Sequence, residues 1–216
     1  MNKEERQKLL EQKLKDMSVY EKQLYADGIT TVAGVDEVGR GPLAGPVLAA
    51  CVVLPKDWNI PGLDDSKKLS EKKRNEMFDI ISDRALAIGI GMADNSVIDD
   101  INILNATRLA MRQAVSKAQE SLGAAIGHIL VDAVTIDNLD NPQTAIIKGD
   151  AKSISIAAAS IIAKVTRDNI MKEYALTYPG YAFESNKGYG TKAHYQGISE
   201  QGITPIHRKT FLKGIL

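Results

Sequence analysis

Four acidic residues lie at or just after the ends of apolar segments that read as strands. Asp36 and Glu37 end one such segment, Asp132 ends a second, and Asp150 follows a third. Strand ends that share one edge of a sheet lie close together, and ligands bind at such edges. Carboxylate oxygens are the ligands that Mg²⁺ and Mn²⁺ prefer, and a pair of these ions can hydrolyse a phosphodiester. The four acids therefore predict a metal-dependent hydrolytic site.

Each acid also has a simpler interpretation. A single Asp after a strand is usually a turn former or a helix cap, and this alternative stays open for Asp132 and Asp150 taken separately. It is weaker for Asp36 and Glu37, because neighbours on a strand point to opposite faces. One of these two carboxylates is then expected to be buried, and a buried carboxylate needs a partner. A cation is the partner we expect.

Two glycine-rich segments carry groups that suit a nucleic-acid backbone. Arg40 lies between Gly39 and Gly41. Its guanidinium could donate two parallel hydrogen bonds to a phosphate, while the glycines allow the substrate to approach the backbone closely. Tyr189 lies between lysines in the flexible segment 187–192 and could stack on a sugar or a base. A structural salt bridge for Arg40 and a surface turn for Tyr189 are the alternatives.

Basic residues add possible phosphate contacts. Lys67 belongs to a basic cluster over residues 66–74, and residues 207–209 add positive charge late in the chain. A solvated surface is the alternative for such clusters. A helix that begins near residue 153 would also attract phosphate at its N-terminus. The three histidines show no spacing typical of a zinc site.

Hydrophobic periodicity indicates the elements that position these residues. Five strands are predicted, at residues 31–37, 47–54, 86–93, 129–134 and 144–148. Helices are predicted at residues 2–26, after a cap at Ser70, at 102–122 with Leu104 on its apolar stripe, and at 153–176. Glycines in the third strand suggest a close backbone approach. Strands alternating with helices indicate an α/β domain, with a mixed sheet covered on both faces.

Composition limits the class of protein. A chain of 216 residues suits one domain with an appendage. With 27 basic and 27 acidic residues the net charge is zero, so nucleic acid would need a local basic surface. Cys51 is the only cysteine, which fits a reducing compartment and a small buried side chain. Without a signal peptide or a long apolar run, we expect a cytoplasmic protein that does not associate with membranes.

Several motifs together resemble the ribonuclease HII family of the ribonuclease H-like superfamily. The resemblance opens with GVDEVGRGPLAGPV at residues 34–47 and extends from about residue 31 to 212. Further blocks follow in the family's order: DSKKLS at 65–70, VD at 131–132, KGD at 148–150, SIAAASIIAKVTRD at 155–168, GYGT at 188–191 and HRKTF at 207–211.

The resemblance implies an α/β, three-layer ribonuclease H-like fold with a five-stranded mixed sheet. Residues 1–28, predicted above as an amphipathic helix, fall outside the family pattern as an N-terminal extension, and the resemblance implies a catalytic domain at 29–216 whose helical C-terminal region starts at about 178. It also implies a monomer that cleaves RNA in RNA/DNA hybrids and incises 5′ of ribonucleotides embedded in duplex DNA. The products would carry 3′-hydroxyl and 5′-phosphate ends.

Site residues follow from the same resemblance. The four acids would bind two Mn²⁺ or Mg²⁺ ions and carry catalysis. The segment Gly39-Arg40-Gly41 would sense the ribose 2′-hydroxyl, Lys67 would bind substrate, and Tyr189 would stack on the neighbouring deoxyribose. Arg40 and the short extension favour this family over ribonuclease HIII, which carries a large N-terminal domain. A catalytically silent binding module, or a resolvase- or transposase-like nuclease, are the competing hypotheses.

Overall fold

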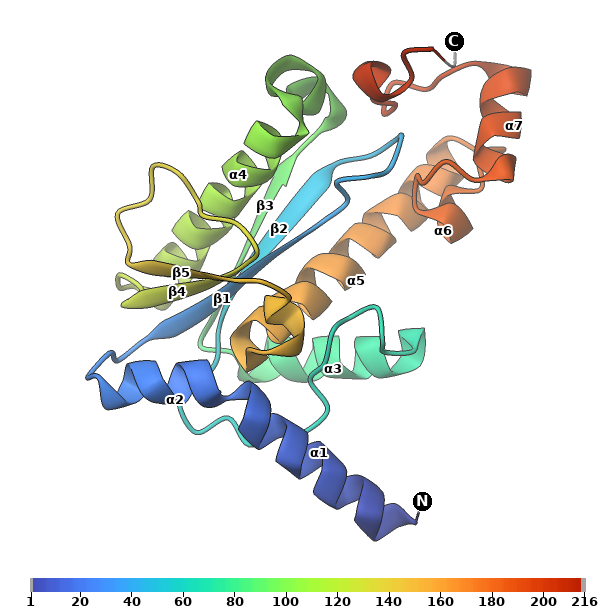
Figure 1. Ribbon diagram of the computed structural model, residues 1–216. Coiled ribbons are helices and arrows are strands. Elements are labelled where there is room, and N and C mark those ends of the chain that lie inside the picture. The colour runs from blue at the N-terminus through green and yellow to red at the C-terminus, as the bar shows by residue number, and fades with distance from the viewer. Residues whose placement is uncertain (1, 215–216) are drawn as a thin grey trace.

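The computed structural model describes residues 2–214 and contains one five-stranded sheet in the order β3-β2-β1-β4-β5 (Figure 1). β1 is antiparallel to β2, which is antiparallel to β3, whereas β1, β4 and β5 run parallel. The predicted mixed sheet is confirmed. The strands are β1 Val32–Val38, β2 Val47–Val53, β3 Ala87–Ala93, β4 His128–Asp132 and β5 Gln143–Ile146.

Helices cover both faces of the sheet. α5 (Ile154–Thr177) and α3 (Glu71–Arg84) lie on one face, and α4 (Asn95–Leu122) lies on the other (Figure 1). The pleat of β2 divides the core accordingly, because Ala50 packs on the α5 side and Cys51 on the α4 side. The predicted three-layer α/β arrangement is therefore confirmed. Among residues 2–214, none of these helices has the length and apolar character needed to cross a membrane.

Glycines let both layers of helices touch the sheet through backbone atoms. A Cβ atom on Gly34 of β1 would lie 2.0 Å from the carbonyl carbon of Ser155 in α5. On the other face, Cβ atoms on Gly89 and Gly91 would lie within 2.0 Å of carbonyl oxygens of α4. The close approach predicted for the glycines of the third strand is present, and β1 uses the same device.

The helix predicted at residues 102–122 begins earlier, at Asn95. The side chain of Asp94 caps it by accepting a hydrogen bond from the backbone N–H of Val97 at 3.0 Å. Asn102 interrupts the helix with a positive φ of 65°. The hydrophobic periodicity is broken there, so it predicts only the part of the helix after residue 102. Leu104 is 40% exposed, so its predicted place on the apolar stripe is wrong.

The predicted helix 2–26 is two helices, α1 (Lys3–Met17) and α2 (Val19–Ala26), separated at Ser18. The hydroxyl of Ser18 donates to the carbonyl of Leu14 at 2.5 Å, which favours a bend. Met17 packs in the core on the α5 side. The buried carboxylate of Glu21 accepts hydrogen bonds from the Ser153 hydroxyl at 2.5 Å and the Ser155 N–H at 3.0 Å. The segment therefore packs on the domain at the start of α5.

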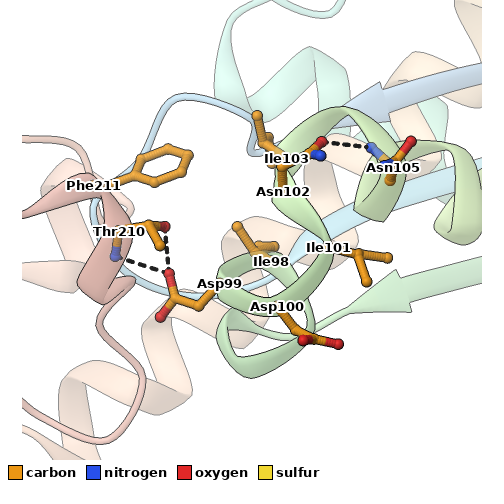
Figure 2. Close-up of a pocket in the computed structure, with 9 residues that line it drawn as sticks. All are labelled: Ile98, Asp99, Asp100, Ile101, Asn102, Ile103, Asn105, Thr210 and Phe211. Carbon is orange, nitrogen blue, oxygen red and sulfur yellow. Dashed lines mark hydrogen bonds between the residues drawn. The ribbon is translucent and has the colours of Figure 1, made fainter.

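After α5 the chain forms the short helices α6 (Phe183–Asn186), α7 (Lys192–Gln201) and η2 (Lys209–Phe211), as predicted for the C-terminal region. The carboxylate of Asp99 in α4 accepts hydrogen bonds from the backbone N–H groups of Lys209 and Thr210 at 2.8 and 2.9 Å. Figure 2 shows Asp99 and Thr210 beside a cavity of about 570 Å³. This contact docks η2 on the first turns of α4.

Substitution of Gly34 by Ala should lower the free energy of unfolding by about 3–5 kcal/mol, because the new methyl group would meet the backbone of α5 rather than a side chain that can move. Gly123→Ala is the control. Gly123 has a φ of 69°, and no atom lies within 4 Å of the position that a Cβ atom would take there, so only backbone strain of about 1–2 kcal/mol is expected. Urea unfolding of both variants measures the difference, and equal losses would contradict the steric argument.

Candidate active site

The acids of β1 and β4 lie level with each other. Val35 is paired with Val131 in the parallel ladder, so Asp36 and Asp132 lie at the same height on neighbouring strands, Asp132 at the end of β4 and Asp36 two residues before the end of β1. Gly34 faces α5, and Asp36, two residues on, points to the same side of the sheet. Asp36 is buried, with 7% of its surface exposed. The expectation that one acid of the Asp36-Glu37 pair is buried is therefore met.

A backbone hydrogen bond brings Asp150 to the same edge. The N–H of Gly149 donates to Oδ1 of Asp132 at 2.7 Å, and Asp150 follows in the 3₁₀ helix η1 (Gly149–Ala151). A Cβ on Gly149 would lie 2.5 Å from Cδ1 of Ile156, so this turn closes tightly against α5. Three strand ends thus deliver carboxylates to one edge of the sheet.

The charges of these carboxylates influence one another's pKa values. Burial raises the pKa of Asp36 well above its usual value, and the charges of Glu37, Asp132 and Asp150 raise it further. Burial also raises the pKa of Asp150, and Asp65 and Asp132 add to the effect. Such a group of like charges, partly removed from water, is stable in its ionised form only with a counter-charge.

One carboxylate oxygen of Glu37 accepts a hydrogen bond, and the other has no hydrogen-bond partner among residues 2–214. Oε1 accepts a hydrogen bond from the Arg40 guanidinium at 3.3 Å, which partly offsets the effect of burial on the Glu37 pKa. Oε2 is buried and has no hydrogen-bond partner within residues 2–214. Within residues 2–214 no group of three or more acidic, histidine or cysteine side chains lies close enough together to hold a metal ion by itself. A metal here would therefore need ligands from water or substrate besides these carboxylates.

Two adjoining cavities open onto the acids. One of about 190 Å³ is lined by Asp36 and Glu37 together with Lys67, Lys164 and Tyr189. A second of about 460 Å³ is lined by residues that include Asp132, Asp150 and Lys67. Lys67 borders both cavities and therefore joins the two halves of the acidic cluster. The structure thus gathers Lys67 and Tyr189 around the four acids.

Arg208 holds the glycine-rich segment in place. Its guanidinium donates to the carbonyls of Gly39 at 2.6 Å, Arg40 at 2.9 Å and Gly45 at 2.8 Å. The side chain is fully buried, so of the positive charge noted at residues 207–209 only that of Lys209 is exposed, and His207 and Arg208 are not available for surface phosphate contacts. Burial lowers the pKa of Arg208 to about 9, and the group stays charged at neutral pH.

A second buried guanidinium, Arg167 of α5, was missed as a functional residue. It donates to the carbonyls of Pro46 and Lys187, each at 2.9 Å, and so ties the glycine-rich segment to the loop that carries Tyr189. A Cβ atom on Gly41 would lie 3.4 Å from the Tyr189 ring, which places the two segments side by side. An arginine within a long apolar helix was the available signal, because a buried cation must have partners.

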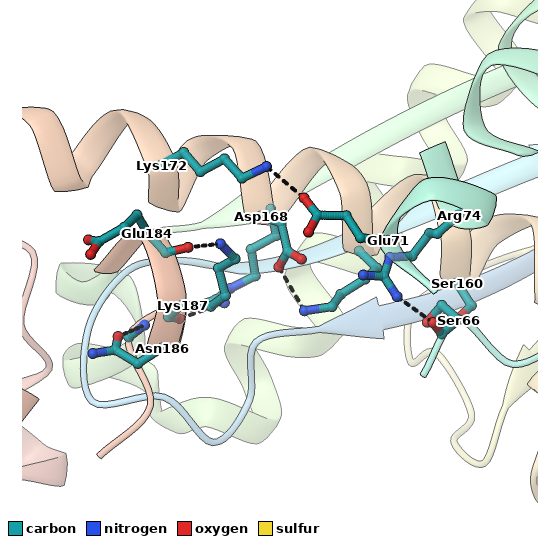
Figure 3. A network of polar contacts seen from close by, with 12 residues as sticks. Ser66, Glu71, Arg74, Ser160, Asp168, Lys172, Glu184, Asn186 and Lys187 are labelled. Atoms are coloured by element: carbon teal, nitrogen blue, oxygen red, sulfur yellow. Dashed lines mark hydrogen bonds and ion pairs between the residues drawn. The ribbon is translucent and has the colours of Figure 1, made fainter. Parts of the chain in front are cut away.

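Polar contacts from α5 and α3 fix the loop that carries Lys67 (Figure 3). The hydroxyl of Ser160 donates to that of Ser66 at 2.7 Å, and Arg74 donates to the carbonyl of Ser66 at 2.7 Å. Arg74 is therefore a loop support, not the free phosphate-binding cation that the basic cluster suggested. Lys164, which the sequence did not single out, forms an ion pair with Asp168 at 2.7 Å.

Known proteins share this architecture and sequence. The family model described as Ribonuclease HII matches residues 33–213. A Ribonuclease HII of Clostridioides difficile (strain 630) is 55% identical over 206 residues, covering 95% of this chain and 79% of the relative.

Solved structures agree in fold. The crystal structure of the ribonuclease H2 from Pyrococcus horikoshii OT3 is 28% identical, with a TM-score of 0.68 over 86% of this chain and 97% of that chain. A structure of Bst-RNase HIII, at 20% identity and a TM-score of 0.65, is covered over only 67% of its length. The match at 20% identity supports the fold alone, whereas the family model and the 55% identical relative extend over nearly all of the chain. This protein belongs to the ribonuclease HII family.

Proposed function

We propose that this endoribonuclease cleaves RNA in RNA/DNA hybrids and incises 5′ of ribonucleotides embedded in duplex DNA, leaving 3′-hydroxyl and 5′-phosphate ends. One observation carries the proposal: the edge of the sheet that gathers four carboxylates lies beside Gly39-Arg40-Gly41 and Tyr189. Carboxylates suit metal-assisted phosphodiester cleavage, and a sugar-reading segment suits discrimination between RNA and DNA.

Asp36, Glu37, Asp132 and Asp150 would hold the metal, Mn²⁺ or Mg²⁺. The unpartnered oxygen of Glu37 and the raised pKa of Asp36 fit a cation at this edge. When bound, two such ions would supply an activated water and stabilise the leaving oxygen. Since no three of these side chains within residues 2–214 lie close enough together to hold an ion by themselves, water and substrate phosphate would have to complete its ligation.

The remaining residues would bind and orient the substrate. Lys67 and Lys164 face the cavity beside Asp36 and would contact phosphates as point charges. The backbone of Gly39-Arg40-Gly41, held from behind by Arg208, would meet the ribose 2′-hydroxyl. Tyr189, 47% exposed, would stack on the adjacent deoxyribose.

Organisation in the cell follows the same proposal. We propose that residues 1–28 form an extension to a catalytic domain at 29–216, and that the protein acts as a cytoplasmic monomer. Its partners would be hybrid and ribonucleotide-containing duplexes. A silent binding module with this fold would bind such duplexes without cutting them, and a resolvase- or transposase-like enzyme would cut branched DNA without ribonucleotides.

Asp132→Asn should lower the cleavage rate about a thousandfold, equivalent to about 4 kcal/mol of transition-state stabilisation. The fold should survive, because Asn retains the oxygen that accepts the Gly149 hydrogen bond. The assay uses duplex DNA with one ribonucleotide and either Mg²⁺ or Mn²⁺, and Asp57→Asn at an exposed position is the control. A fully active Asp132→Asn enzyme removes this carboxylate from catalysis, and an inactive native enzyme with both metals contradicts the proposed function.

Asp36→Asn should stabilise the metal-free protein at pH 7 by about 1–2 kcal/mol while abolishing cleavage. Because the folded-state pKa of Asp36 is raised, stability falls as the pH rises from the unfolded-state pKa, about 4, towards the folded-state pKa. Below about pH 4 the group is protonated in folded and unfolded chains alike, so the advantage of Asn should disappear there. Thermal unfolding in chelator across this pH range tests the sign, and a variant less stable than the native protein at pH 7 would refute it.

A further inference from the structure

Two buried histidines that take no part in the chemistry proposed above are hydrogen-bonded to each other next to the loop that carries Tyr189. His194 of α7 and His207, which follows α7, are both fully buried, and their Nε2 atoms lie 2.9 Å apart. The other ring nitrogens also have partners. Nδ1 of His194 lies 2.9 Å from the carbonyl oxygen of Tyr189. Nδ1 of His207 accepts from the N–H of Thr204 at 2.9 Å and also lies 2.8 Å from the Thr204 hydroxyl, which can donate to it as well.

These contacts determine where each proton lies. Because the Thr204 N–H donates to Nδ1 of His207, that nitrogen is unprotonated, and a neutral ring carries its proton on Nε2. That proton is donated to Nε2 of His194, which leaves the His194 proton on Nδ1, facing the Tyr189 carbonyl. The donors therefore run in one direction, from Thr204 to Tyr189.

The surroundings favour neutral rings. The edges of Tyr181 and Phe183 enclose the pair, with ring centroids 5.3 Å from His207 and 5.1 Å from His194 respectively. Burial lowers the pKa of both histidines, that of His207 to about 4. A proton added to Nε2 of His194 would face the Nε2–H of His207, and a proton added to Nδ1 of His207 would face the N–H of Thr204.

Tyr189 depends on such backbone contacts for its position. Its ring is 47% exposed and so has little packing to hold it, and it stands between Gly188 and Gly190. Its carbonyl accepts hydrogen bonds from His194 and from the N–H of Thr191 at 2.8 Å. The hydrogen bond from the His194 side chain links this loop to α7.

We infer that His194 and His207 are positioning residues, a one-way hydrogen-bond relay that fixes Tyr189 beside Gly41 for contact with the substrate sugar. The inference rests on the proposed role of Tyr189. The histidines touch no reacting atom, and their effect passes through the Tyr189 carbonyl.

Two substitutions of His194 separate the two ends of its ring. Asn places an amide nitrogen near the Nδ1 position and keeps a donor for Tyr189, whereas Gln reaches toward His207 and loses that donor. On duplex DNA with one ribonucleotide, His194→Gln should raise KM about three- to tenfold with kcat little changed, the effect of one lost hydrogen bond. His194→Asn should stay nearer the native value. Equal effects of Asn and Gln would overturn the inference.

A double-mutant cycle distinguishes positioning from general support of the fold. In a Tyr189→Ala background, His194→Gln should cause no further rise in KM, since the residue it positions is gone. The same rise in both backgrounds would overturn the relay.

Nitrogen-15 NMR of the native protein tests the relay without any substitution and without activity. The expected spectrum shows His194 protonated at Nδ1 and His207 protonated at Nε2 at pH 7. The opposite tautomers, or a charged ring, would overturn the inference even if every variant unfolded. If the native protein fails to cleave, the proposed function fails, and the NMR result still decides whether the relay exists.

Discussion

The direct contact between β1 and α5 at Gly34 is the constraint on which the site depends. It sets the distance between the sheet and the helix at a value that only glycine permits. α5 then presents Ser160 to the Lys67 loop, Lys164 to the cavity and Arg167 to the glycine-rich segment. A shift of α5 against the sheet would move all three groups relative to Asp36. The packing of the core therefore determines the geometry of the site.

The acidic cluster opposes folding. Burial raises the pKa of Asp36, and repulsion by the neighbouring carboxylates raises it further. The surrounding sheet is well packed enough to hold this arrangement, since residues on both faces of β1 and β2 are buried. Strained or repulsive groups persist where the rest of the structure determines their position, and a free Glu37 oxygen beside a buried Asp36 is such a case.

The acids and the sheet could be predicted from sequence because their signals are local. Apolar segments ending in Asp or Glu indicate strand ends, and parallel strand ends meet at one edge. Arg208 and the His194–His207 pair could not be predicted, because their partners are carbonyls and rings more than ten residues away. The kink at Asn102 was also hidden, since one residue with positive φ divides a helix whose composition gives no warning.

Arg208 has a further consequence for the order in which the protein matures. It holds the carbonyl of Arg40 across a separation of 168 residues, so the segment it supports emerges from the ribosome long before its donor. Loop closure over such a distance is among the slower steps in folding. During synthesis β1, which carries Asp36, can pair with β2 while the neighbouring segment still lacks its support. The segment Gly39-Arg40-Gly41 therefore acquires that support only when the last residues of the chain have been made.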